Sequence, residues 1–350
     1  MDDANSIRLR KLEHLRVCME KDVSFRKSNG FERYEFEYHA LPEINLSDID
    51  LSTKFLGHDF KMPFFIDALT GGADGTEVIN RNLAGAAQQL GLGMGVGSQR
   101  AMLENPDLIH TYQVRDVAPD IFLLGNLGAS QLLNYNREQV GQLVTSVGAS
   151  GMAFHLNPLQ ELVQAGGDTN WRNVLAAIKT FCQTADVPVV VKEVGSGLSA
   201  RVAGQLASAG AVALNVAGAG GTSFARVEYY RGSSLAAAFF EWGIPTAESL
   251  QQCLGAVSVP LIASGGIRNG LECAKALAMG AGLVGFALPL LKPAMESAEA
   301  VIEKINRIAL ELKKTMLLLG ACNMAELKSR SLNRVDFLNE TPFSRGGVAH

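Results

Sequence analysis

The sequence is poor in cysteine, and its cysteines form no recognisable motif. The chain has five of them, Cys18, Cys182, Cys253, Cys273 and Cys322, which lie far apart, without a CxxC pair and without a histidine at the spacing of a zinc ligand. This spacing argues against a disulfide framework and against a zinc knuckle. We therefore expect the protein to work in a reducing compartment.

Long apolar runs and basic clusters are missing as well. No stretch of about 18 uncharged apolar residues occurs, and the N-terminal segment MDDANSIRLRKLEHLRVCMEK is charged where a signal peptide has an apolar core. We expect no membrane span and a cytoplasmic location. The formal net charge is -4 and the pI is near 5.9. Because polyanion binding depends on clustered Lys and Arg, we expect no nucleic-acid partner.

The sequence does contain a repeated alternation of short apolar runs and longer segments with helical periodicity. From residue 61 onwards the apolar runs, which predict strands, are 62–68, 92–97, 121–126, 152–157, 187–194, 211–218, 259–266 and 281–288. Most segments between them have apolar residues at i, i+3 and i+4 and end in glycine, as amphipathic helices do. Eight such βα units over roughly 230 residues predict a (β/α)₈ TIM barrel, with a doubly wound open sheet as the alternative.

The remaining segments define the expected domain organisation. Residues 1–60 predict an N-terminal arm, a helix followed by an extended segment, and residues 61–320 predict the barrel that binds cofactor and substrate. Residues 321–350 predict a C-terminal tail, of which we expect 339–350 to be mobile. The segment 223–245 follows the sixth strand and is too long for a simple connection, so we interpret it as a candidate lid.

Polar residues close nearly every apolar run. They are Thr70 with Gly71 and Gly72, Ser98 with Gln99 and Arg100, Asn126, His155 with Asn157, Lys192 with Glu193, Asn215, and Gly265 with Gly266. In a TIM barrel the active site forms at the C-terminal ends of the strands, where these residues would meet. Chance would distribute polar residues over both ends of the barrel, so the pattern predicts one functional site at this rim.

The strongest local signal is ASGGIRNGLECAKALAMGAGLVGFA, residues 263–287. A glycine pair after the seventh run opens a helix and another glycine-containing turn follows the eighth, so backbone N–H groups can surround a phosphate. The alternative is that these glycines only permit tight turns. A phosphate cup near Lys192, Asn126 and Thr70 suggests FMN, because a lysine beside the N1/C2 edge stabilises the anionic reduced ring. Lys192 could instead form a Schiff base or an ion pair with Glu193.

Eight motifs occur in a characteristic order between about residue 8 and residue 320. They are RLRKLEH, ALTGG, GVGSQR, GNLGA, HLNPLQE, VVKEVGSGL, GAGGTSF and ASGGIRNG. In this order and spacing the chain resembles type 2 isopentenyl diphosphate isomerase. The resemblance implies interconversion of isopentenyl and dimethylallyl diphosphate, a reaction without net redox change that needs Mg²⁺ and reduced FMN. It also implies a homo-oligomer, a tetramer or an octamer.

The resemblance further implies roles for individual residues. The flavin contacts would be Ala68, Leu69, Thr70, Gly71, Ser98, Asn126, Lys192, Thr222, Gly265, Gly266, Arg268, Gly285 and Ala287. The substrate contacts would be Arg10, Lys11, Ser98, Arg100, Asn157 and Gln160, and Glu161 would hold the metal. His155 and Gln160 are the catalytic candidates, with Gln160 orienting or relaying because a neutral amide is a poor base.

The chemistry of these residue types agrees with such a substrate. Arg10, Lys11, Arg100 and His155 can give charge-assisted hydrogen bonds to a diphosphate, and a carboxylate offers the hard oxygen that Mg²⁺ prefers. Each also has a structural interpretation. The histidine could be a hydrogen-bonded core residue, Glu161 could cap a helix N-terminus, and RLRKLEH could be a solvated helix face.

Two departures and several rivals accompany the resemblance. Leu69 stands where the family often has Met, and Asn215 where many members have Asp. An α-hydroxy-acid oxidase would have His-Gly-x-Arg where this chain has SGGIRNG, and an inosine-phosphate dehydrogenase would have a cysteine within GAGGTSF. A non-catalytic flavin- or phosphate-binding module is the alternative from another class. The segment GLGMGVG lacks the features of a dinucleotide loop. The sequence therefore leaves open whether NADPH or another reductant serves the flavin.

Overall fold

Eight short parallel strands close into a barrel in the computed structural model, which describes residues 2–335 and the side chains of residues 8–335. The barrel strands are β4 Phe64–Ile66, β5 Gly93–Gly95, β6 Leu123–Gly128, β7 Gly151–Leu156, β8 Val189–Glu193, β9 Ala213–Asn215, β10 Leu261–Ser264 and β11 Leu283–Phe286. They follow one another in chain order, and β11 pairs with β4 to close the cylinder. Each predicted apolar run overlaps one strand. The predicted TIM barrel is confirmed, and the open-sheet alternative is wrong.

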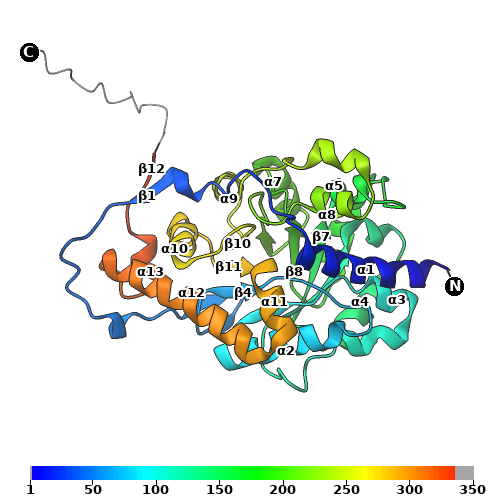
Figure 1. The fold of residues 1–350 in the computed structure, drawn as a ribbon, viewed down its shortest axis with the longest axis horizontal. Coiled ribbons are helices and arrows are strands. Elements are labelled where there is room, and N and C mark those ends of the chain that lie inside the picture. The colour runs from blue at the N-terminus through cyan, green and yellow to red at the C-terminus, as the bar shows by residue number, and fades with distance from the viewer. Residues whose placement is uncertain (1, 336–350) are drawn as a thin grey trace, which may run out of the picture.

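Helices surround the barrel and connect its strands (Figure 1). They are α2 Thr76–Leu90, α3 Arg100–Glu104, α4 Arg137–Ser146, α5 Pro158–Val163, α6 Val174–Thr184, α7 Ala200–Ser208, α8 Phe224–Tyr230, α9 Thr246–Leu254, α10 Gly270–Met279, α11 Leu288–Glu296 and α12 Ala298–Leu318. Shorter 3-10 helices are η1 Phe31–Arg33, η2 Leu46–Asp48, η3 Pro106–Thr111, η4 Ala129–Leu133 and η5 Ser234–Phe239. Within residues 2–335 we find no helix with the length and apolar character needed to cross a membrane.

The barrel interior contains two layers of side chains that differ in polarity. The lower layer is apolar and comprises Phe65, Leu124, Ala153, Val190, Ala213, Ile262 and Leu283. Side chains of a strand alternate between its two faces, so the residue two positions further along points inward again. Those residues are Asp67, Asn126, His155, Lys192, Asn215 and Ser264, which we call the rim layer. The strand period therefore carries the polar groups to the C-terminal mouth of the barrel.

The N-terminal end of the barrel is plugged. Strands β2 Thr53–Phe55 and β3 His58–Phe60 form an antiparallel hairpin. Its residues Phe55 and Phe60 join the lower apolar layer, and Phe122 contacts both rings with centroid distances of 6.5 and 6.2 Å. Because aromatic side chains fill this end, a ligand can enter the barrel only from the rim.

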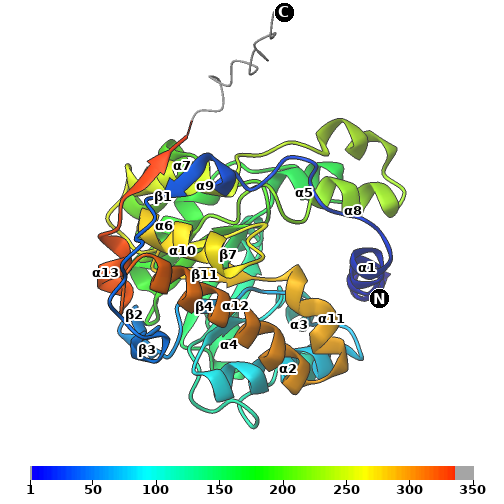
Figure 2. The same ribbon diagram turned by 60° about the vertical axis from the view of Figure 1, so that its left-hand side comes forward.

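The N-terminal arm begins with α1 Asp2–Glu20, in agreement with the helix predicted there. This helix contacts α3 and α8 on the rim side of the barrel, and Figure 2 shows it end-on, near α3 and α8. Further along the arm, β1 Tyr34–Phe36 pairs antiparallel with β12 Leu332–Arg334. The arm is thus connected to the barrel at the rim and at its side.

The C-terminal part of the chain is folded as far as the structure describes it. Helix α13 Met324–Lys328 contacts α10, and β12 pairs with β1. Residues 321–335, which we assigned to a tail, therefore pack against the rest of the chain, whereas the segment 339–350 lies outside the described residues. The candidate lid 223–245 forms α8 and η5, and α8 packs on α5 and α1. The division into arm, barrel and tail, and the lid itself, stay predictions.

Candidate functional site

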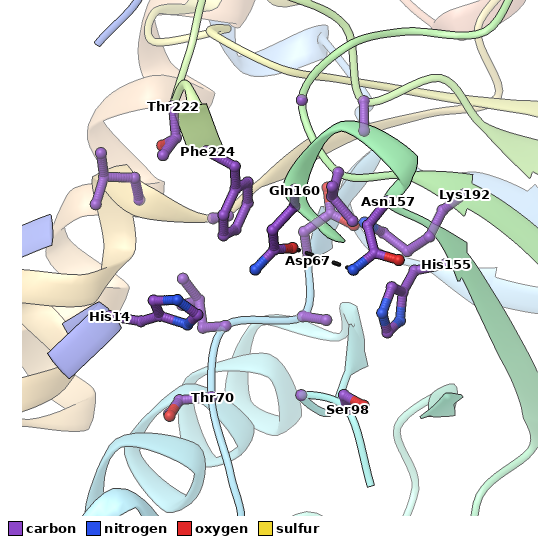
Figure 3. A pocket seen from close by; sticks show the side chains of 18 of the residues that line it. His14, Asp67, Thr70, Ser98, His155, Asn157, Gln160, Lys192, Thr222 and Phe224 are labelled. Atoms are coloured by element: carbon purple, nitrogen blue, oxygen red, sulfur yellow. Dashed lines mark hydrogen bonds between the residues drawn. The ribbon is translucent and has the colours of Figure 1, made fainter. Parts of the chain in front are cut away.

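A cavity of about 300 Å³ lies at the C-terminal ends of the strands. Figure 3 shows side chains from different strands and from the arm helix converging on one space. Every residue to which the resemblance gives a role lines this cavity: Arg10, Lys11, Ala68, Leu69, Thr70, Gly71, Ser98, Arg100, Asn126, His155, Asn157, Gln160, Glu161, Lys192, Thr222, Gly265, Gly266, Arg268, Gly285 and Ala287. Of the polar residues and glycines that close the apolar runs, Gly72, Gln99, Glu193 and Asn215 are not among the lining residues. The individual role of each residue stays a prediction.

Strand register brings the rim layer to a common height. His155 of β7 pairs with Lys192 of β8, and Lys192 pairs with Asn215 of β9. Asn126 lies on β6, where its amide nitrogen donates to the Val96 carbonyl oxygen at 3.0 Å. Its amide oxygen is therefore the atom that lies 3.0 Å from Nδ1 of His155. It follows that His155 carries a proton on Nδ1 and presents Nε2 as an acceptor.

Without a bound anion His155 is a neutral imidazole in this site, and the charge-assisted hydrogen bond that we expect from it to a diphosphate stays a prediction. Burial, together with the nearby charges of Lys192 and Lys11, lowers the pKa of His155 to about 3. Removing an imidazolium from water costs free energy, and the two ammonium groups add repulsion. In the absence of an anionic ligand, His155 thus contributes hydrogen bonding and not positive charge.

We expect the protein to lose stability on acidification through His155. Its folded pKa lies below the ordinary 6.5, so between these values the unfolded chain binds more protons and stability falls as the pH falls. From pH 7 to pH 5 this one residue should cost about 2 kcal/mol. Urea unfolding at both pH values should show that His155→Gln loses less stability than the unmodified protein. His110→Gln, at an exposed position, is the control, and equal losses in all three proteins would contradict this account.

Two glycine turns, one at Gly220 and Gly221 and one at Gly265 and Gly266, pack together and build a cradle beside the cavity. Gly265 and Gly266 have φ of +104° and +75°, values that favour glycine. A Cβ on Gly266 would collide with the backbone of Gly220, and one on Gly221 would come within 2.6 Å of the Gly266 nitrogen. The two turns therefore lie backbone against backbone. Thr222 and Arg268 line the cavity beside them, so hydroxyl, guanidinium and peptide groups face one space, an arrangement that fits the phosphate end of FMN.

Lys192 is directed at the cavity and not at its neighbour's carboxylate. Its ammonium donates to the backbone oxygen of Glu193 at 2.7 Å. The carboxylate of Glu193 instead accepts N–H bonds from Val194, Gly195 and Ser196, and burial raises its pKa to about 7. The alternative of an ion pair between Lys192 and Glu193 is therefore wrong. The ammonium keeps hydrogens that can reach a bound ring.

Glu161 lies on α5, which follows β7, and lines the same cavity. Its carboxylate accepts from the Asn157 amide at 2.9 Å and from the backbone N–H of Asp168 at 2.8 Å. The amide oxygen of Asn157 is buried without a hydrogen-bond partner. In the part of the chain with described side chains, no group of three or more His, Cys, Asp and Glu could hold a metal by itself. One carboxylate and one unpaired amide oxygen fit Mg²⁺ that is completed by ligand oxygens and water.

The arm helix turns its cations toward the barrel. Arg10, Lys11 and His14 line the cavity, so RLRKLEH is not only a solvated face. The Lys11 ammonium donates to the Ser98 carbonyl and the Tyr112 hydroxyl, both at 2.7 Å, and also to the Gly71 carbonyl. Burial, with repulsion from Arg10, lowers the pKa of Lys11 to about 7. These contacts show Lys11 joining the arm to two rim loops, and its predicted contact with substrate stays a prediction.

Several cavity residues escaped sequence reasoning. His14 follows Arg10 by four positions and so lies on the same helix face. This spacing could have predicted that His14 also faces the cavity. Its Nε2 lies 2.7 Å from a carboxylate oxygen of Glu228, which ties α1 to α8. Phe224 and Asp67 also line the cavity. Asp67 could have been found by the strand period, being two residues beyond Phe65.

The two departures from the family pattern both lie at the rim. Leu69 lines the cavity. Asn215 is fully enclosed: its amide nitrogen donates to the Asp67 carboxylate at 2.7 Å, and its oxygen accepts from the Ser264 hydroxyl at 2.8 Å. A carboxyl group is therefore present beside position 215, supplied by Asp67 after strand β4 and not by a residue of β9.

Comparison with known proteins gives the same assignment. A family model described as FMN-dependent dehydrogenase matches residues 115–334. An isopentenyl-diphosphate delta-isomerase from Pyrococcus furiosus is 46% identical, over 97% of this chain and 90% of the relative. One from Synechococcus is 51% identical, over 88% of this chain and 91% of the relative. This chain belongs to the isopentenyl-diphosphate delta-isomerase family.

The solved structures that resemble this isomerase-family chain are more distant in sequence. The structure of (S)-mandelate dehydrogenase has a TM-score of 0.62 at 16% identity, covering 95% of this chain and 98% of that one. A lactate oxidase structure from Pediococcus acidilactici has a TM-score of 0.68 at 17% identity, covering 96% of each chain. At such identities the similarity concerns the barrel fold alone.

Proposed function

We propose that this protein interconverts isopentenyl and dimethylallyl diphosphate, with reduced FMN and Mg²⁺ bound at the barrel rim. The observation that carries the proposal is that one cavity gathers a glycine cradle, a lysine, a cluster of arm and rim cations and a carboxylate. The isomerase relatives align over nearly the whole chain, with 46% identity in one case. An FMN-dependent oxidoreductase of the mandelate type is disfavoured, because such structures share only 16% identity.

FMN fits the cradle and the neighbouring rim. The turns at Gly265 and Gly266, with Thr222 and Arg268, would hold its phosphate, while Lys192 would face the ring. When bound, reduced FMN supplies an electron-rich plane that stabilises positive charge and a nitrogen that can exchange a proton. The residues of the chain have to orient the substrate, balance its negative charge and exclude water.

The diphosphate requires positive charge and a metal. Arg10 and Arg100 line the same cavity as Glu161, and Arg10 interacts electrostatically with both. Both guanidinium groups can form paired hydrogen bonds with phosphate oxygens. Arg100 is held in place by Glu104, whose oxygen accepts from its Nε at 2.9 Å. Glu161 and the unpaired oxygen of Asn157 would hold Mg²⁺. These groups fix the charged end of the substrate.

The hydrocarbon end requires a dry surface. Moving the double bond develops positive charge on a tertiary carbon, and water in the site would capture it. Leu15, Phe224, Ile267 and Leu288 line the cavity with apolar surface. Gln160 accepts from the Asn157 amide at 3.3 Å (Figure 3). That bond orients Gln160, which can then position the substrate or relay a proton.

Finer features belong to the same proposal. We propose that an external reductant, NADPH or another, reduces the flavin. The GLGMGVG segment contributes strand β5 to the barrel and does not form a loop of the kind that holds a dinucleotide. We also propose a homo-oligomer, a tetramer or an octamer, and a cytoplasmic location. The isoprenoid diphosphate is the proposed small-molecule partner.

Proton exchange into substrate tests the function directly. The holoprotein, with its flavin reduced anaerobically, receives isopentenyl diphosphate and Mg²⁺ in D₂O, and NMR follows the mixture. We expect dimethylallyl diphosphate with deuterium, and none of it with oxidised flavin or without Mg²⁺. Unlabelled and unrearranged starting material under all redox conditions would refute the isomerase, leaving a flavin-binding module. Flavin reduction by a 2-hydroxy acid would point to an oxidoreductase.

A further inference from the structure

Asp67 is a buried carboxylate in the barrel lumen that the proposed reaction does not use. Its side chain lies in the layer above the lower apolar layer and the residue is only 5% exposed. One oxygen accepts from the Asn215 amide at 2.7 Å. The other faces Gly285, where a Cβ would come within 2.7 Å of it. Within the described side chains, Asp67 takes part in no ion pair. Burying a carboxylate against one neutral donor is costly.

The hydrogen bond from Asn215 to Asp67 crosses the lumen. Asp67 follows β4 and Asn215 ends β9, and β10 and β11 lie between these strands in the barrel. The oxygen of Asn215 accepts from the Ser264 hydroxyl at 2.8 Å and from the Ala217 N–H at 3.2 Å. Because a backbone N–H can only donate, the amide nitrogen of Asn215 must face Asp67. The Asp67 oxygen that faces Asn215 is therefore held as a hydrogen-bond acceptor.

Asp67 and Lys192 face a common small space. A second cavity of about 10 Å³ lies in the lumen, lined by Asp67, Asn126, Lys192 and Asn215 together with the lower apolar layer. That volume is close to what a single water molecule needs. Asp67 and Lys192 also line the large cavity. Asp67 and Lys192 thus line both cavities of the lumen, and charges inside a protein interact more strongly than in water.

We infer that Asp67 is a positioning residue that sets the reduction potential of the flavin by opposing the charge of Lys192 from inside the barrel. The inference rests on the proposed FMN site. Reduction adds negative charge to the ring, which Lys192 favours and a fixed carboxylate disfavours. Removing the carboxylate leaves the ammonium unopposed.

Anaerobic reductive titration of the FMN-loaded protein with a reference dye tests the inference. Asp67→Asn should move the midpoint potential in the positive direction by about 30 mV, a tenfold change in the equilibrium constant of a two-electron couple. The double variant Asp67→Asn/Asn215→Asp returns one carboxylate to the other end of the same hydrogen bond. Its potential should return most of the way to that of the unmodified protein. Asp59→Asn, on the exposed hairpin at the plugged end, should cause no shift.

The possible outcomes distinguish an electrostatic role of Asp67 from a purely structural role. If Asp67 only supported the fold, Asp67→Asn would lower the melting temperature and leave the potential unchanged, and that result overturns the inference. Failure of the double variant to bind FMN, or to restore the potential, overturns it as well, even where Asp67→Asn alone does not fold. The titration needs bound FMN but no isomerase activity. Absence of FMN binding in the unmodified protein would instead refute the proposed function.

Discussion

Replacing Glu161 with glutamine is expected to remove nearly all isomerase activity and to leave FMN bound. The substitution keeps the size of the side chain and deletes the charge that Mg²⁺ prefers in a ligand. It also disturbs the local hydrogen bonds. Glu161 accepts from the Asn157 amide nitrogen, and a glutamine whose own amide nitrogen faced that donor could not accept from it. We expect kcat/KM to fall by at least about 10²-fold, with a higher Mg²⁺ requirement.

Activity measured against Mg²⁺ concentration, together with FMN content from absorbance, decides this prediction. Glu303→Gln is the control, since Glu303 is exposed on α12 and far from the cavity lining; it should keep full activity. Full activity of the Glu161 variant would mean that the metal is held elsewhere. Loss of FMN from that variant would mean that Glu161 supports the cofactor site.

The strands of this protein were predictable because their signals are local. Each apolar run overlapped a strand, although β9 Ala213–Asn215 covers only part of the run 211–218. The excess belongs to the rim, where Val216 and Ala217 are buried although they lie beyond the end of β9. Apolar character reports burial, which strands and buried loops share. The strand ends were thus less predictable than the strands.

The membership of the site was also predictable, since the strand period and the barrel topology force polar strand ends to one rim. Contacts between distant elements were not. The hairpin 53–60 was expected only as extended chain, and its role as a plug depends on Phe55 and Phe60 meeting Phe122 across the barrel. The bond between Asp67 and Asn215 joins residues 148 positions apart, and no local pattern encodes it.

Charge states were the least predictable property. His155 was expected to contribute positive charge, but burial lowers its pKa to about 3. A sequence gives the ordinary pKa of a residue type, whereas desolvation and neighbouring ammonium groups depend on the folded surroundings. The same limit applies to Lys11, whose lowered pKa follows from its buried position between two rim loops.

Replacing Gly266 with alanine should abolish FMN binding at ordinary cofactor concentrations. Gly266 has φ of +75°, a conformation that costs an alanine roughly 1–2 kcal/mol. The new Cβ would also lie 2.8 Å from the Gly221 nitrogen, so the two turns of the cradle must move apart. Backbone groups that surround a phosphate act only when they converge. We expect FMN affinity to fall by more than about tenfold, because re-forming the cradle around the phosphate would impose this local strain again on binding, and about 1.4 kcal/mol corresponds to that factor.

Gly57 offers a control that distinguishes the effect of opening the cradle from the effect of backbone strain. Gly57 has φ of +81°, with nothing within 4 Å of its Cβ position, and it lies in the hairpin that plugs the other end of the barrel. Gly57→Ala should therefore incur similar strain, lowering the melting temperature slightly and leaving FMN affinity unchanged. Titration of flavin-stripped protein with FMN, followed by fluorescence quenching, compares both variants. If the Gly266 variant binds FMN as tightly as the Gly57 variant, the phosphate is held elsewhere on the rim, because a separated cradle cannot keep its N–H groups aimed at one anion.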